Sequence, residues 1–498
     1  MFDISRFTES RSWSFVTRLA RLLGDWNIPA YIVGGWVRDR LLGWDTDDID
    51  ITVKADGLVV AERLASALGG KYVPLDKVNR IGRIVLPDTD SPAKGQRTID
   101  VASFQDSIEK DLSRRDFTID AIAIDLSTLV KGVSVELNDP FHGQGDLENK
   151  IIRAVANTCF TADPVRLLRA VRLSVLLGFT IEEKTESLIM RDAALISQVA
   201  GERVREEVLL ILSSPEAGRC IEYIDKLQLL TELFPELEPS REFPQPSEHY
   251  WDVLHHSLKT VMALDYLLRQ DKWEYTGEDI ITEVPWTDEL QAYFEVKVSH
   301  NSNRMALTRL AALFHDIAKP KTKTVEQGGR VRFLGHADEG VTMVTAILER
   351  LRFSTRETRF VETLVKYHLR PTQMGPPEMP TNRAIYRYYR DTGEAAVGIL
   401  FLSLADHLAT RGPNLDRDNW KMHSQIVAYV LSQRPAEEKR PIRLIDGYDI
   451  MTNLGLGPGP RVGELLELVQ EAQAAGEVTT KDEALKLATK LMHARSDE

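Results

Sequence analysis

The sequence predicts an α/β domain with a small mixed sheet, followed by an all-α neck, a helical domain and a helical tail. Between residues 1 and 150, short runs of β-branched residues alternate with helical periods, whereas from Thr161 onward only the helical period continues. The chain has 498 residues, of which 43% are hydrophobic and 28% are charged. This is the composition of a globular protein with room for about three domains.

The N-terminal domain, residues 1–150, is expected to contain strands and helices in alternation. Its first strand is expected to end at Gly34-Gly35, and the segment from Pro87 to Arg97, rich in Pro, Asp, Ser and Gly, is expected to be a turn or loop. In chain order the expected elements are the strand Ala30–Val33, the helix Trp36–Leu42, the strand Ile49–Val53, the helix Gly57–Leu68 and the strands Arg83–Leu86 and Thr98–Phe104.

Helices are expected in the rest of the chain. Asp163-Pro164 has the pattern of a helix start, and Gly178 is expected to end that helix. Prolines between Pro235 and His249 favour a linker, and the run from Gly455 to Pro460 predicts a second break. The expected helices are Val165–Leu177, Ile181–Val199, Arg203–Leu212, Trp251–Leu268 and those that follow Arg304. The corresponding domains are a neck at 151–235, a helical domain at 250–430 and a tail at 431–498.

The net charge of −13 argues against indiscriminate electrostatic binding of DNA or RNA. Residues 271–299, however, carry eight acids against two lysines, and this segment is expected to be an insertion on the surface. The segment accounts for nearly half of the net charge, and without it the chain would carry −7. A polynucleotide substrate is therefore compatible with the composition, although DNA is not an expected partner.

Cysteine usage and hydropathy predict the compartment. Cys159 and Cys220 are too few for a disulfide framework or a four-thiolate zinc site, which favours a reducing environment. No run of about 18 apolar residues occurs, and the residues after Met1 lack the basic and apolar regions of a secretory signal. The expected location is the cytoplasm, without a membrane partner.

Asp48 and Asp50 flank Ile49 on an expected strand. Because side chains alternate along a strand, both carboxylates are expected on one face while Ile49 turns into the core. Two like charges this close are unfavourable without a cation between them, and carboxylate oxygens suit Mg²⁺, which also bridges substrate phosphates. The pair predicts a catalytic metal site for phosphoryl transfer. The alternative for such a pair in isolation is a solvated turn.

Glycines and an arginine precede these carboxylates. Gly34 and Gly35 allow backbone N–H groups to approach a phosphate closely, and the N-terminus of the next helix favours an anion. Arg38 on that helix offers a charge-assisted fork for a triphosphate. Together these residues predict a nucleotide site beside the two carboxylates.

These motifs resemble those of a known family. Gly34-Gly35-Trp36-Val37-Arg38-Asp39, Leu41-Leu42-Gly43 and Asp47-Asp48-Ile49-Asp50 are similar to the signature of class II nucleotidyltransferases, which include tRNA CCA-adding enzymes and bacterial poly(A) polymerases. The resemblance continues, in the family's order, at Arg114–Ala121, Asp139–Arg153, Asp163–Arg169 and Glu202–Glu207. It implies a polymerase-beta-like nucleotidyltransferase head that uses CTP and ATP.

The resemblance implies roles for individual residues. Asp116 is expected to accept a hydrogen bond from a ribose hydroxyl. Asp163 and Arg166, spaced i and i+3, are expected to be neighbours on one helix face. In the family this pair acts as a protein template that reads the nucleotide, and an intrahelical ion pair is the alternative. Further nucleotide contacts are expected from Arg114, Arg115, Arg153 and Arg169.

Three positions leave questions open. Asp100, on the Thr98–Phe104 strand, is either a third carboxylate near the metals or a support for the pair. Asp120 stands where asparagine is commoner in the family. Ala162 stands where the family has an acidic residue before the template pair, which bears on how Arg166 is held when the enzyme changes from C to A.

A second metal site is expected beyond the linker. His256, His315-Asp316 and Asp406 have the order of an HD metal site, with ligands that suit Mn²⁺, Ni²⁺, Fe²⁺ or Mg²⁺. His255 is the less favoured neighbour of His256. A resemblance to the HD phosphohydrolase superfamily is supported by Lys319, Gly335-His336, His368–Pro371 and Ser403–Ala409. It implies hydrolysis of phosphate esters, such as 2′,3′-cyclic phosphates. The alternative is a helical scaffold that only supports RNA binding.

The sequence therefore predicts a metal-dependent enzyme that adds CCA to the 3′ end of tRNA without a nucleic-acid template. Mg²⁺ is expected in the head, and Ni²⁺, Mn²⁺ or another divalent ion at the HD site. The tail, from Gly455 to Glu464, resembles the segment with which bacterial members cradle tRNA. The alternatives are an enzyme that adds only A or only CC, a poly(A) polymerase, and an HD phosphohydrolase with an inactive head.

Overall fold

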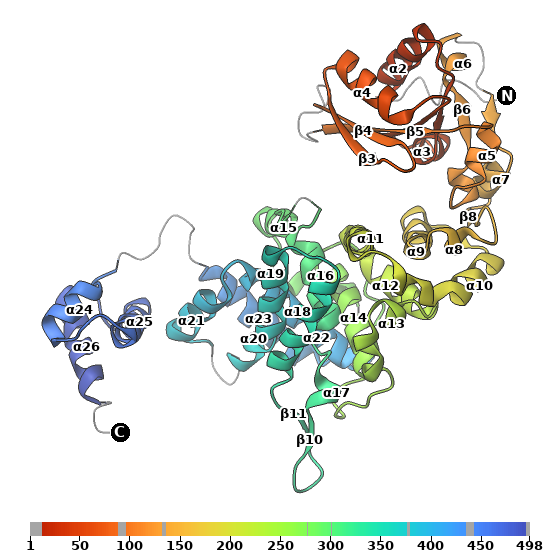
Figure 1. Ribbon diagram of the computed structural model, residues 1–498. Helices are drawn as coiled ribbons and strands as arrows, with labels where there is room; N and C mark the ends of the chain where they lie inside the picture. Colours follow the sequence, from red (N-terminus) through yellow and green to blue (C-terminus); the bar gives the residue numbers. More distant parts are fainter. Residues whose placement is uncertain are drawn as a thin grey trace. The chain divides into compact units, whose positions relative to one another are not determined.

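The computed structural model describes residues 12–87, 96–131, 136–275, 277–299, 301–375, 379–434 and 443–494. The chain divides into two compact units (Figure 1). One comprises residues 1–199 and 223–233, and the other comprises 200–222 and 234–498. The segment predicted as a neck, 151–235, is thus shared between the two units. The loop predicted at Pro87–Arg97 lies largely outside the described residues.

A seven-stranded mixed sheet forms the centre of the described part of the first unit (Figure 1). The strand order is β3-β4-β5-β2-β1-β6-β7, in which only the central pair β2–β5 is parallel. The α/β head with a mixed sheet is therefore confirmed. The strands are β1 (Ala30–Val33), β2 (Asp48–Val53), β3 (Lys71–Asp76), β4 (Ile81–Pro87), β5 (Gln96–Ser103), β6 (Ala123–Asp125) and β7 (Leu137–Asn138).

Three of these strands were not expected from the sequence. Strand β3 lies at the edge of the sheet and most of its side chains are exposed, so it lacks the apolar alternation of a half-buried strand. Strands β6 and β7 have only three and two residues. The central strands were recognisable because their inward side chains are fully covered, as shown by Ile32, Ile49, Ile99 and Val101, each 0% exposed.

Local chemistry explains the helices beside the sheet. Helix α4 (Gly57–Leu68) begins where the Asp56 side chain accepts hydrogen bonds from Leu58 N and Val59 N, and it ends at Gly69, whose φ is +71°. The other helices of this unit are α2 (Trp13–Asp25), α3 (Gly35–Leu41), α5 (Ile108–Leu112), α6 (Leu126–Lys131), α7 (Gly143–Glu148), α8 (Cys159–Ala162), α9 (Arg166–Leu177), α10 (Glu183–Asp192) and α13 (Leu230–Leu233). A short parallel pair, β8 (Ile151–Ile152) and β9 (Thr180–Ile181), accompanies them.

The second unit is helical around α14 (Val253–Leu267), which packs against α16 (Arg304–Phe314) and α22 (Ala396–Arg411). In the first unit, the sequence predicted a single helix at 181–199. The structure has α10 there, followed by a 3₁₀ segment, Ala193–Gln198. Further helices of the second unit are α11 (Gly201–Ser213), α15 (Asp288–Glu295), α17 (Lys319–Thr322), α18 (His336–Arg350), α19 (Thr355–Tyr367), α20 (Arg370–Gln373), α21 (Asn382–Thr392) and α23 (Arg417–Ser432). Helix α12 (Ala217–Lys226) contributes residues to both units.

A β-hairpin interrupts this helical region, contrary to the prediction of helices alone. Its strands are β10 (Lys323–Val325) and β11 (Val331–Phe333), paired antiparallel. With three residues in each strand, the hairpin has no period long enough to separate it from a loop. It joins α17 to α18 and projects from the unit in Figure 1.

The sequence suggested that the acidic segment 271–299 is a surface insertion, but the structure shows that it is not. Its apolar side chains are buried, including Ile280, Leu290 and Phe294 at 2%, 7% and 2% exposure. The ring of Phe294 packs edge-on against Phe401 of α22, with centroids 5.2 Å apart. The segment is amphipathic, so its charges face outward while its apolar face completes the core of this unit.

The last helices have a small core of their own. They are α24 (Gly447–Leu454), α25 (Pro460–Ala474) and α26 (Lys481–Ala494), and they enclose Ile450, Leu465 and Ala488. The break predicted at Gly455–Pro460 is confirmed, since Gly455 ends α24 with φ +66° and Pro460 begins α25. In the described parts of the chain, no helix has the length and apolar character that would let it cross a membrane.

Candidate functional sites

Three carboxylates lie on one face of two neighbouring strands in the head. Ile49 is 0% exposed, so strand alternation places Asp48 and Asp50 together on the opposite face of β2. Asp50 is directly opposite Asp100 on the parallel strand β5, and Thr98 Oγ1 donates to Asp48 Oδ1 at 3.1 Å. Both oxygens of Asp100 accept from Arg83, at 2.7 and 2.8 Å. Its charge is therefore largely compensated, whereas Asp48 and Asp50 are the pair available to a cation.

Gly34 brings the end of β1 against this pair. Its φ is +71°, and a Cβ atom at this position would lie 2.9 Å from Arg115 Nη1 and 3.3 Å from Asp50 Oδ2. Only glycine combines that conformation with so close an approach. Gly35 follows as the first residue of α3. The glycine pair, Arg115 and the carboxylates thus converge at one place.

Burial raises the pKa of Asp50 to about 6, with Arg115 opposing the rise and Asp48 and Asp100 adding to it. A carboxyl whose charged form is disfavoured by burial and by two neighbouring acids is stabilised when a cation binds. The oxygen ligands and the negative charge fit Mg²⁺, which prefers carboxylates in such numbers together with substrate phosphates.

Arg38 is held in the site by two acids. Its Nη1 donates to Asp120 Oδ1 and its Nε donates to Asp39 Oδ1, both at 2.8 Å. Asp120 is 2% exposed, and its second oxygen has no hydrogen-bond partner among the described residues. Burial lowers the pKa of Arg38, but Asp120 and Asp39 outweigh it, so the pKa is raised and the guanidinium stays charged.

Asp116 is buried and is paired with Arg169 of α9. Asp116 Oδ2 lies 2.9 Å from Arg169 Nε, and its Oδ1 accepts from Phe117 N at 3.0 Å. Burial acts to raise the pKa of Asp116, but Arg169 and Arg166 outweigh it and lower the pKa. Arg169 also influences the pKa values of Asp50 and Arg38, which places it within the same site.

The spacing of Asp163 and Arg166 suggested that they share one face of a helix, but in the structure they do not. Helix α9 begins at Arg166, whereas Asp163 has an extended conformation after α8, with φ −153° and ψ 97°. The Asp163 carbonyl accepts from Arg166 N at 3.2 Å, so the two are linked through the backbone. The Arg166 guanidinium donates to two backbone carbonyls, those of Arg114 at 2.7 Å and Cys159 at 3.3 Å. Main-chain oxygens therefore hold this arginine.

The remaining predicted arginines differ in their surroundings. The Arg114 side chain is 65% exposed and pairs with Asp111 at 3.0 Å. The Arg153 guanidinium pairs with Asp146 at 2.9 Å and with Glu182. These two acids account for its charge, and none of the ion pairs found for it involves Asp48, Asp50 or Asp116.

In the second unit, the four predicted HD ligands come together from different helices. His256 lies on α14, His315-Asp316 follows α16, and Asp406 lies on α22. His256 Nε2 is 3.1 Å from Asp406 Oδ1, 3.4 Å from Asp316 Oδ2 and 3.2 Å from His315 Nε2. His256 and His315 are both 0% exposed. Two imidazole nitrogens and two carboxylates gathered around His256 Nε2 are a donor set that fits a divalent cation.

Two further histidines extend this cluster and were not assigned as ligands from the sequence. His336 begins α18 and His368 follows α19, and their Nε2 atoms lie 3.4 and 3.8 Å from Asp316 Oδ1. Asp316 thus presents Oδ2 to one group, with His256 and His315, and Oδ1 to another, with His336 and His368. A carboxylate between two such groups fits a pair of cations bridged by Asp316.

The orientation of the imidazoles is set by the backbone. Nδ1 of His315, His336 and His368 lies 2.8, 2.7 and 2.6 Å from the carbonyl oxygen of the residue three positions earlier. A proton on each Nδ1 donates to that carbonyl, which directs Nε2 into the cluster, as is usual for histidines that bind metals. His315 and His368 follow the ends of α16 and α19, whereas His336 begins α18. The local signals for His336 and His368 are the motifs Gly335-His336 and His368–Pro371.

Charge in the cluster is tightly coupled. Burial opposes the charged form of His315, but Asp316 and Asp406 outweigh it and raise its pKa to about 10. Burial likewise acts to raise the pKa of Asp316, but His315 and Lys319 outweigh it and hold that pKa well below its usual range. Lys319 Nζ lies 2.5 Å from Asp316 Oδ2. Positive groups thus gather around Asp316, where cations are expected to take the place of protons.

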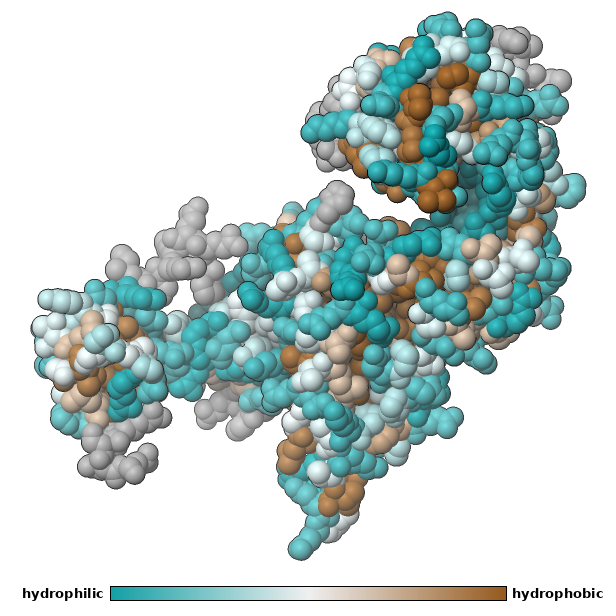
Figure 2. Space-filling view, in the orientation of Figure 1, coloured by the Kyte–Doolittle hydropathy of each residue, from teal (hydrophilic) through white to brown (hydrophobic). Residues whose placement is uncertain are grey.

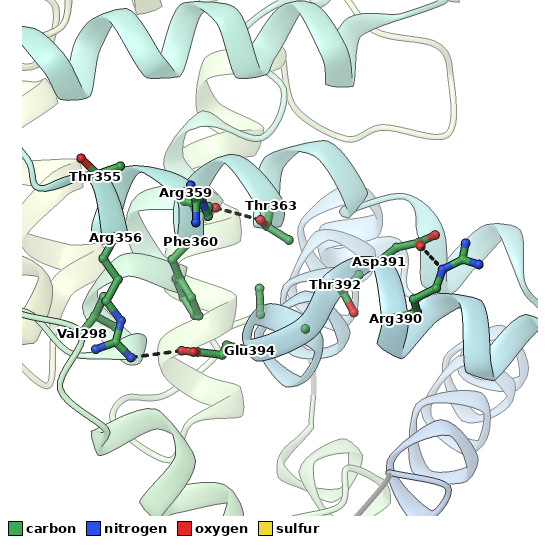
Figure 3. Close-up of a pocket in the computed structure, with 12 residues that line it drawn as sticks. Val298, Thr355, Arg356, Arg359, Phe360, Thr363, Arg390, Asp391, Thr392 and Glu394 are labelled. Carbon is green, nitrogen blue, oxygen red and sulfur yellow. Dashed lines mark hydrogen bonds and ion pairs between the residues drawn. The ribbon is translucent and has the colours of Figure 1, made fainter. Parts of the chain in front are cut away.

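Two cavities adjoin the histidines, and a larger one lies elsewhere in the unit. The cavity of about 600 Å³ in Figure 3 is lined by residues of α19 and of the segment before α22. Arg356 and Arg390 of this cavity are paired with its own Glu394 and Asp391, at 3.3 and 2.8 Å. The cavity of about 390 Å³ that contains Asp316, His336 and Asp406 is smaller, but it opens onto the candidate metal ligands, and the cavity of about 480 Å³ reaches them at His336.

Three known families match separate parts of the chain, and each of the two candidate metal sites lies within one of these matches. The "Poly A polymerase head domain" family matches residues 30–153, the "Probable RNA and SrmB- binding site of polymerase A" family matches 178–240, and the "HD domain" family matches 253–411. The first match contains the three carboxylates of the head, and the last contains the histidine cluster.

Curated relatives cover nearly the whole chain. An A-adding tRNA nucleotidyltransferase of Deinococcus radiodurans is 33% identical over 464 residues, covering 91% of this chain and 94% of the relative. The chain belongs to the tRNA nucleotidyltransferase family. A CC-adding tRNA nucleotidyltransferase of Thermus thermophilus is 32% identical, covering 91% of this chain and 92% of the relative. The chain is therefore an enzyme of a family in which metal dependence is general, and its nucleotidyltransferase and HD domains are of types that generally use divalent metals.

Solved structures confirm the fold of this tRNA nucleotidyltransferase. The Thermotoga maritima CCA-adding enzyme complexed with tRNA has a TM-score of 0.61 at 22% identity, with 99% of both chains covered. A CCA-adding enzyme in complex with ATP has a TM-score of 0.64 at 22% identity, with 97% of this chain and 96% of that chain covered. The head, helical body and HD domain are thus one known architecture.

Proposed function

We propose that this tRNA nucleotidyltransferase adds the CCA sequence to the 3′ end of tRNA, using CTP and ATP and no nucleic-acid template. The observation that carries the proposal is the convergence of Asp48, Asp50, Arg115 and Gly34 in the head. The tRNA 3′-hydroxyl oxygen forms a bond to the α-phosphorus of the nucleotide, the bond to pyrophosphate breaks, and a proton is released. The relatives whose names include tRNA nucleotidyltransferase support this reaction.

Asp48 and Asp50 would hold Mg²⁺, which supplies charge neutralisation for the triphosphate and for the attacking oxygen. Arg38, Arg115 and Arg169 lie around these carboxylates and are placed to bind the phosphates. Asp100, with both oxygens on Arg83, is better suited to support Asp50 than to bind metal itself. Asp116 would accept a hydrogen bond from the ribose hydroxyl, in place of part of its ion pair with Arg169.

Changing either carboxylate tests the metal assignment. Asp48→Ala or Asp50→Ala should lower nucleotide addition below about a hundredth of the wild-type rate, because the cation site is lost. Binding of tRNA, measured by gel shift, should change little. Asp25→Ala, an exposed aspartate at the end of α2, is the matched control. Turnover above that limit in either variant would refute the metal assignment.

Asp163 and Arg166 are proposed to read the base. Arg166 is fixed by the carbonyls of Arg114 and Cys159, and so it can present a rigid donor although Ala162 supplies no acid. Asp163→Ala and Arg166→Ala should weaken the preference for CTP and ATP over GTP and UTP more than they weaken triphosphate affinity. The measurement is incorporation of each nucleotide singly. Unchanged selectivity in both variants would exclude the template role.

A second candidate is a partial reaction, either CC or A alone. It is favoured by the relatives that cover more than nine tenths of this chain, which are named A-adding and CC-adding enzymes. Purified protein should be given tRNA that lacks CCA and tRNA that ends in CC, with CTP and ATP singly and together. Full CCA synthesis on the shorter tRNA supports the main proposal. Arrest after CC, or activity only on tRNA that ends in CC, assigns the specialist function instead.

The HD centre is proposed to hydrolyse phosphate esters with divalent cations bound by His256, His315, Asp316 and Asp406. His336 and His368 would provide a second position bridged by Asp316. Ni²⁺ and Mn²⁺ suit imidazole together with carboxylate, and when bound they would supply polarisation of a water molecule for attack on phosphorus. A cytoplasmic location is proposed as well, which is supported by two buried cysteines that form no disulfide.

A further inference from the structure

Two cavities meet at the HD cluster and share one wall. The first, of about 390 Å³, contains Asp316 and Asp406. The second, of about 480 Å³, lies beside it. Both volumes are within the range of small-molecule sites. The residues that line both cavities are Phe333, Leu334, His336 and Leu369.

The shared wall is a ridge at the base of the β10–β11 hairpin. Phe333 ends β11, and Leu334 after it is 66% exposed although it is a large apolar residue. Figure 2 shows hydrophobic surface on this projecting part of the unit. His336, two positions further, belongs to the metal-binding cluster and lines both cavities. A phosphate at the cluster would therefore lie at the foot of the ridge, with one cavity on each side.

The first cavity is suited to the phosphate and to one adjoining group. It is lined by Lys319, Arg332 and His249, with the ring of Phe333 as an apolar surface. Lys319 Nζ is held between Asp316 Oδ2 at 2.5 Å and Gln245 Oε1 at 2.7 Å. A cation fixed beside the bridging carboxylate favours an anionic ester at this position.

The second cavity has the character of a nucleoside site. Its wall includes the half-buried ring of Tyr367, with Lys366 Nζ and Arg370 Cζ each 5.5 Å from the ring centroid. Gln373 adds an amide to the same cavity. An aromatic ring flanked by cations is the usual surface on which proteins stack the bases of single-stranded nucleic acid. Neither a free phosphate nor a monoester at the cluster would need this second cavity.

We propose that the HD centre acts on a phosphodiester that joins two nucleosides, with one nucleoside on each side of the Phe333–Leu334 ridge. This substrate class rests on the proposed hydrolase function of the HD centre. In the reaction a water oxygen forms a bond to phosphorus and the bond from phosphorus to one nucleoside oxygen breaks. That oxygen takes up a proton from the water, and the products are a nucleotide monoester and a nucleoside alcohol.

The test compares esters on the full-length protein with added Ni²⁺ or Mn²⁺. The substrates are adenylyl-3′,5′-adenosine, 2′,3′-cyclic AMP, bis(4-nitrophenyl) phosphate and 4-nitrophenyl phosphate. The dinucleotide should have a KM at least about tenfold below that of each other ester, because its two nucleosides occupy both cavities. A KM for the cyclic nucleotide, the nitrophenyl diester or the monoester that is equal to or below that of the dinucleotide would overturn the proposal and leave the hydrolase function standing. Hydrolysis of none of the four would refute both.

Tyr367 provides a second, independent measurement. Tyr367→Leu should raise the KM for the dinucleotide about tenfold and lower the ratio of its kcat/KM to that of the nitrophenyl diester, since base stacking is lost. Tyr367→Phe keeps the ring and should restore the ratio. Tyr448→Leu, an exposed tyrosine in α24, is the matched control. An equal loss on every ester in Tyr367→Leu, or no restoration by phenylalanine, would contradict stacking at this position.

Discussion

At the scale of single residues, Asp120 and Arg38 join two motifs that are 82 positions apart in the chain. Asp120 is buried and accepts from Arg38 Nη1, so it fixes the direction of a guanidinium that is proposed to bind triphosphate. The same carboxylate adds a negative charge to a site for an anion. Positioning and repulsion therefore act in opposite directions, and substitution can separate them.

Asp120→Ala should raise the KM for CTP and ATP about tenfold, because Arg38 loses the acceptor that orients it. Asp120→Asn retains an oxygen acceptor and removes the charge, so its KM should equal the wild-type value or fall below it. Steady-state kinetics with each nucleotide give both constants. If asparagine and alanine raise KM equally, the charge of Asp120 is itself required and the positioning role is wrong.

His423 gives a dependence of stability on pH in the second unit. It is 7% exposed on α23, with Nε2 3.2 Å from Ser403 Oγ. Burial lowers the pKa of His423 to about 4, with His407 adding to the decrease and Asp406 opposing it. In the unfolded chain the histidine pKa is near 6.5, so between pH 6.5 and pH 4 the unfolded chain binds a proton that His423 in the folded chain does not bind. The stabilising contribution is thus present above the unfolded pKa and is lost as pH falls toward the folded pKa.

Between pH 7 and pH 5 this single group should lower the free energy of unfolding by about 2 kcal/mol. His423→Gln cannot take up a proton, so its unfolding free energy should depend less on pH by that amount. Chemical denaturation followed by circular dichroism at both pH values measures the difference. The exposed residue His493 provides the control His493→Gln. Identical pH dependence in His423→Gln and wild type would show that the buried imidazole does not titrate in this way.

At the scale of elements, the acidic segment 271–299 shows how charge can conceal a buried face. Helix α15 contributes Leu290, Tyr293 and Phe294 to the interior while its acids remain outside. Tyr293 also donates through its hydroxyl to Glu394 O at 2.6 Å, in the segment that precedes α22. This element therefore belongs to the stability of the HD fold.

Phe294→Ala should destabilise the second unit by about 3–5 kcal/mol, since it removes a fully buried ring and leaves a cavity beside Phe401. Val296→Ala, at a position 39% exposed, should change stability by less than about 0.5 kcal/mol. Thermal unfolding of both variants and of the wild type measures these changes in stability. Equal stability of Phe294→Ala and wild type would mean that the segment is only attached to the surface.

At the scale of the whole molecule, each compact unit contains its own candidate chemistry. The carboxylates of the head all lie in the first unit, and the histidine cluster lies in the second. Each site has its own ligands, so loss of one metal centre should leave the other largely intact.

His315→Ala combined with Asp316→Ala should eliminate ester hydrolysis while nucleotide addition falls by no more than about threefold. Both activities are measured on one preparation, with Mg²⁺ alone and with added Ni²⁺ or Mn²⁺. Because these residues are buried, circular dichroism must show a folded chain, and Asp406→Asn provides a conservative second variant. Collapse of nucleotide addition in a folded variant would make the HD region part of the polymerising machinery.

The sequence by itself determined the features that depend on near neighbours. Strand alternation placed Asp48 and Asp50 on one face, and Gly34 is the residue type that its φ of +71° favours. The order of His256, His315-Asp316 and Asp406 indicated one cluster. The α/β head and the helical remainder also followed from local periods. The alternation, the glycine and the periods could be predicted because they depend on residues close in the chain, whereas the HD ligands, which span 150 positions, were indicated by the resemblance of their motifs.

Only the tertiary structure decided which partner each charged group has. It neutralised Asp100 with Arg83, paired Arg153 with Asp146 and Glu182, and held Arg166 on backbone carbonyls. It also brought His336 and His368 to the free oxygen of Asp316 and turned the apolar face of an acidic segment inward. The partners are often far apart in sequence, and electrostatic pairing depends on distance in space, about which local patterns carry no information.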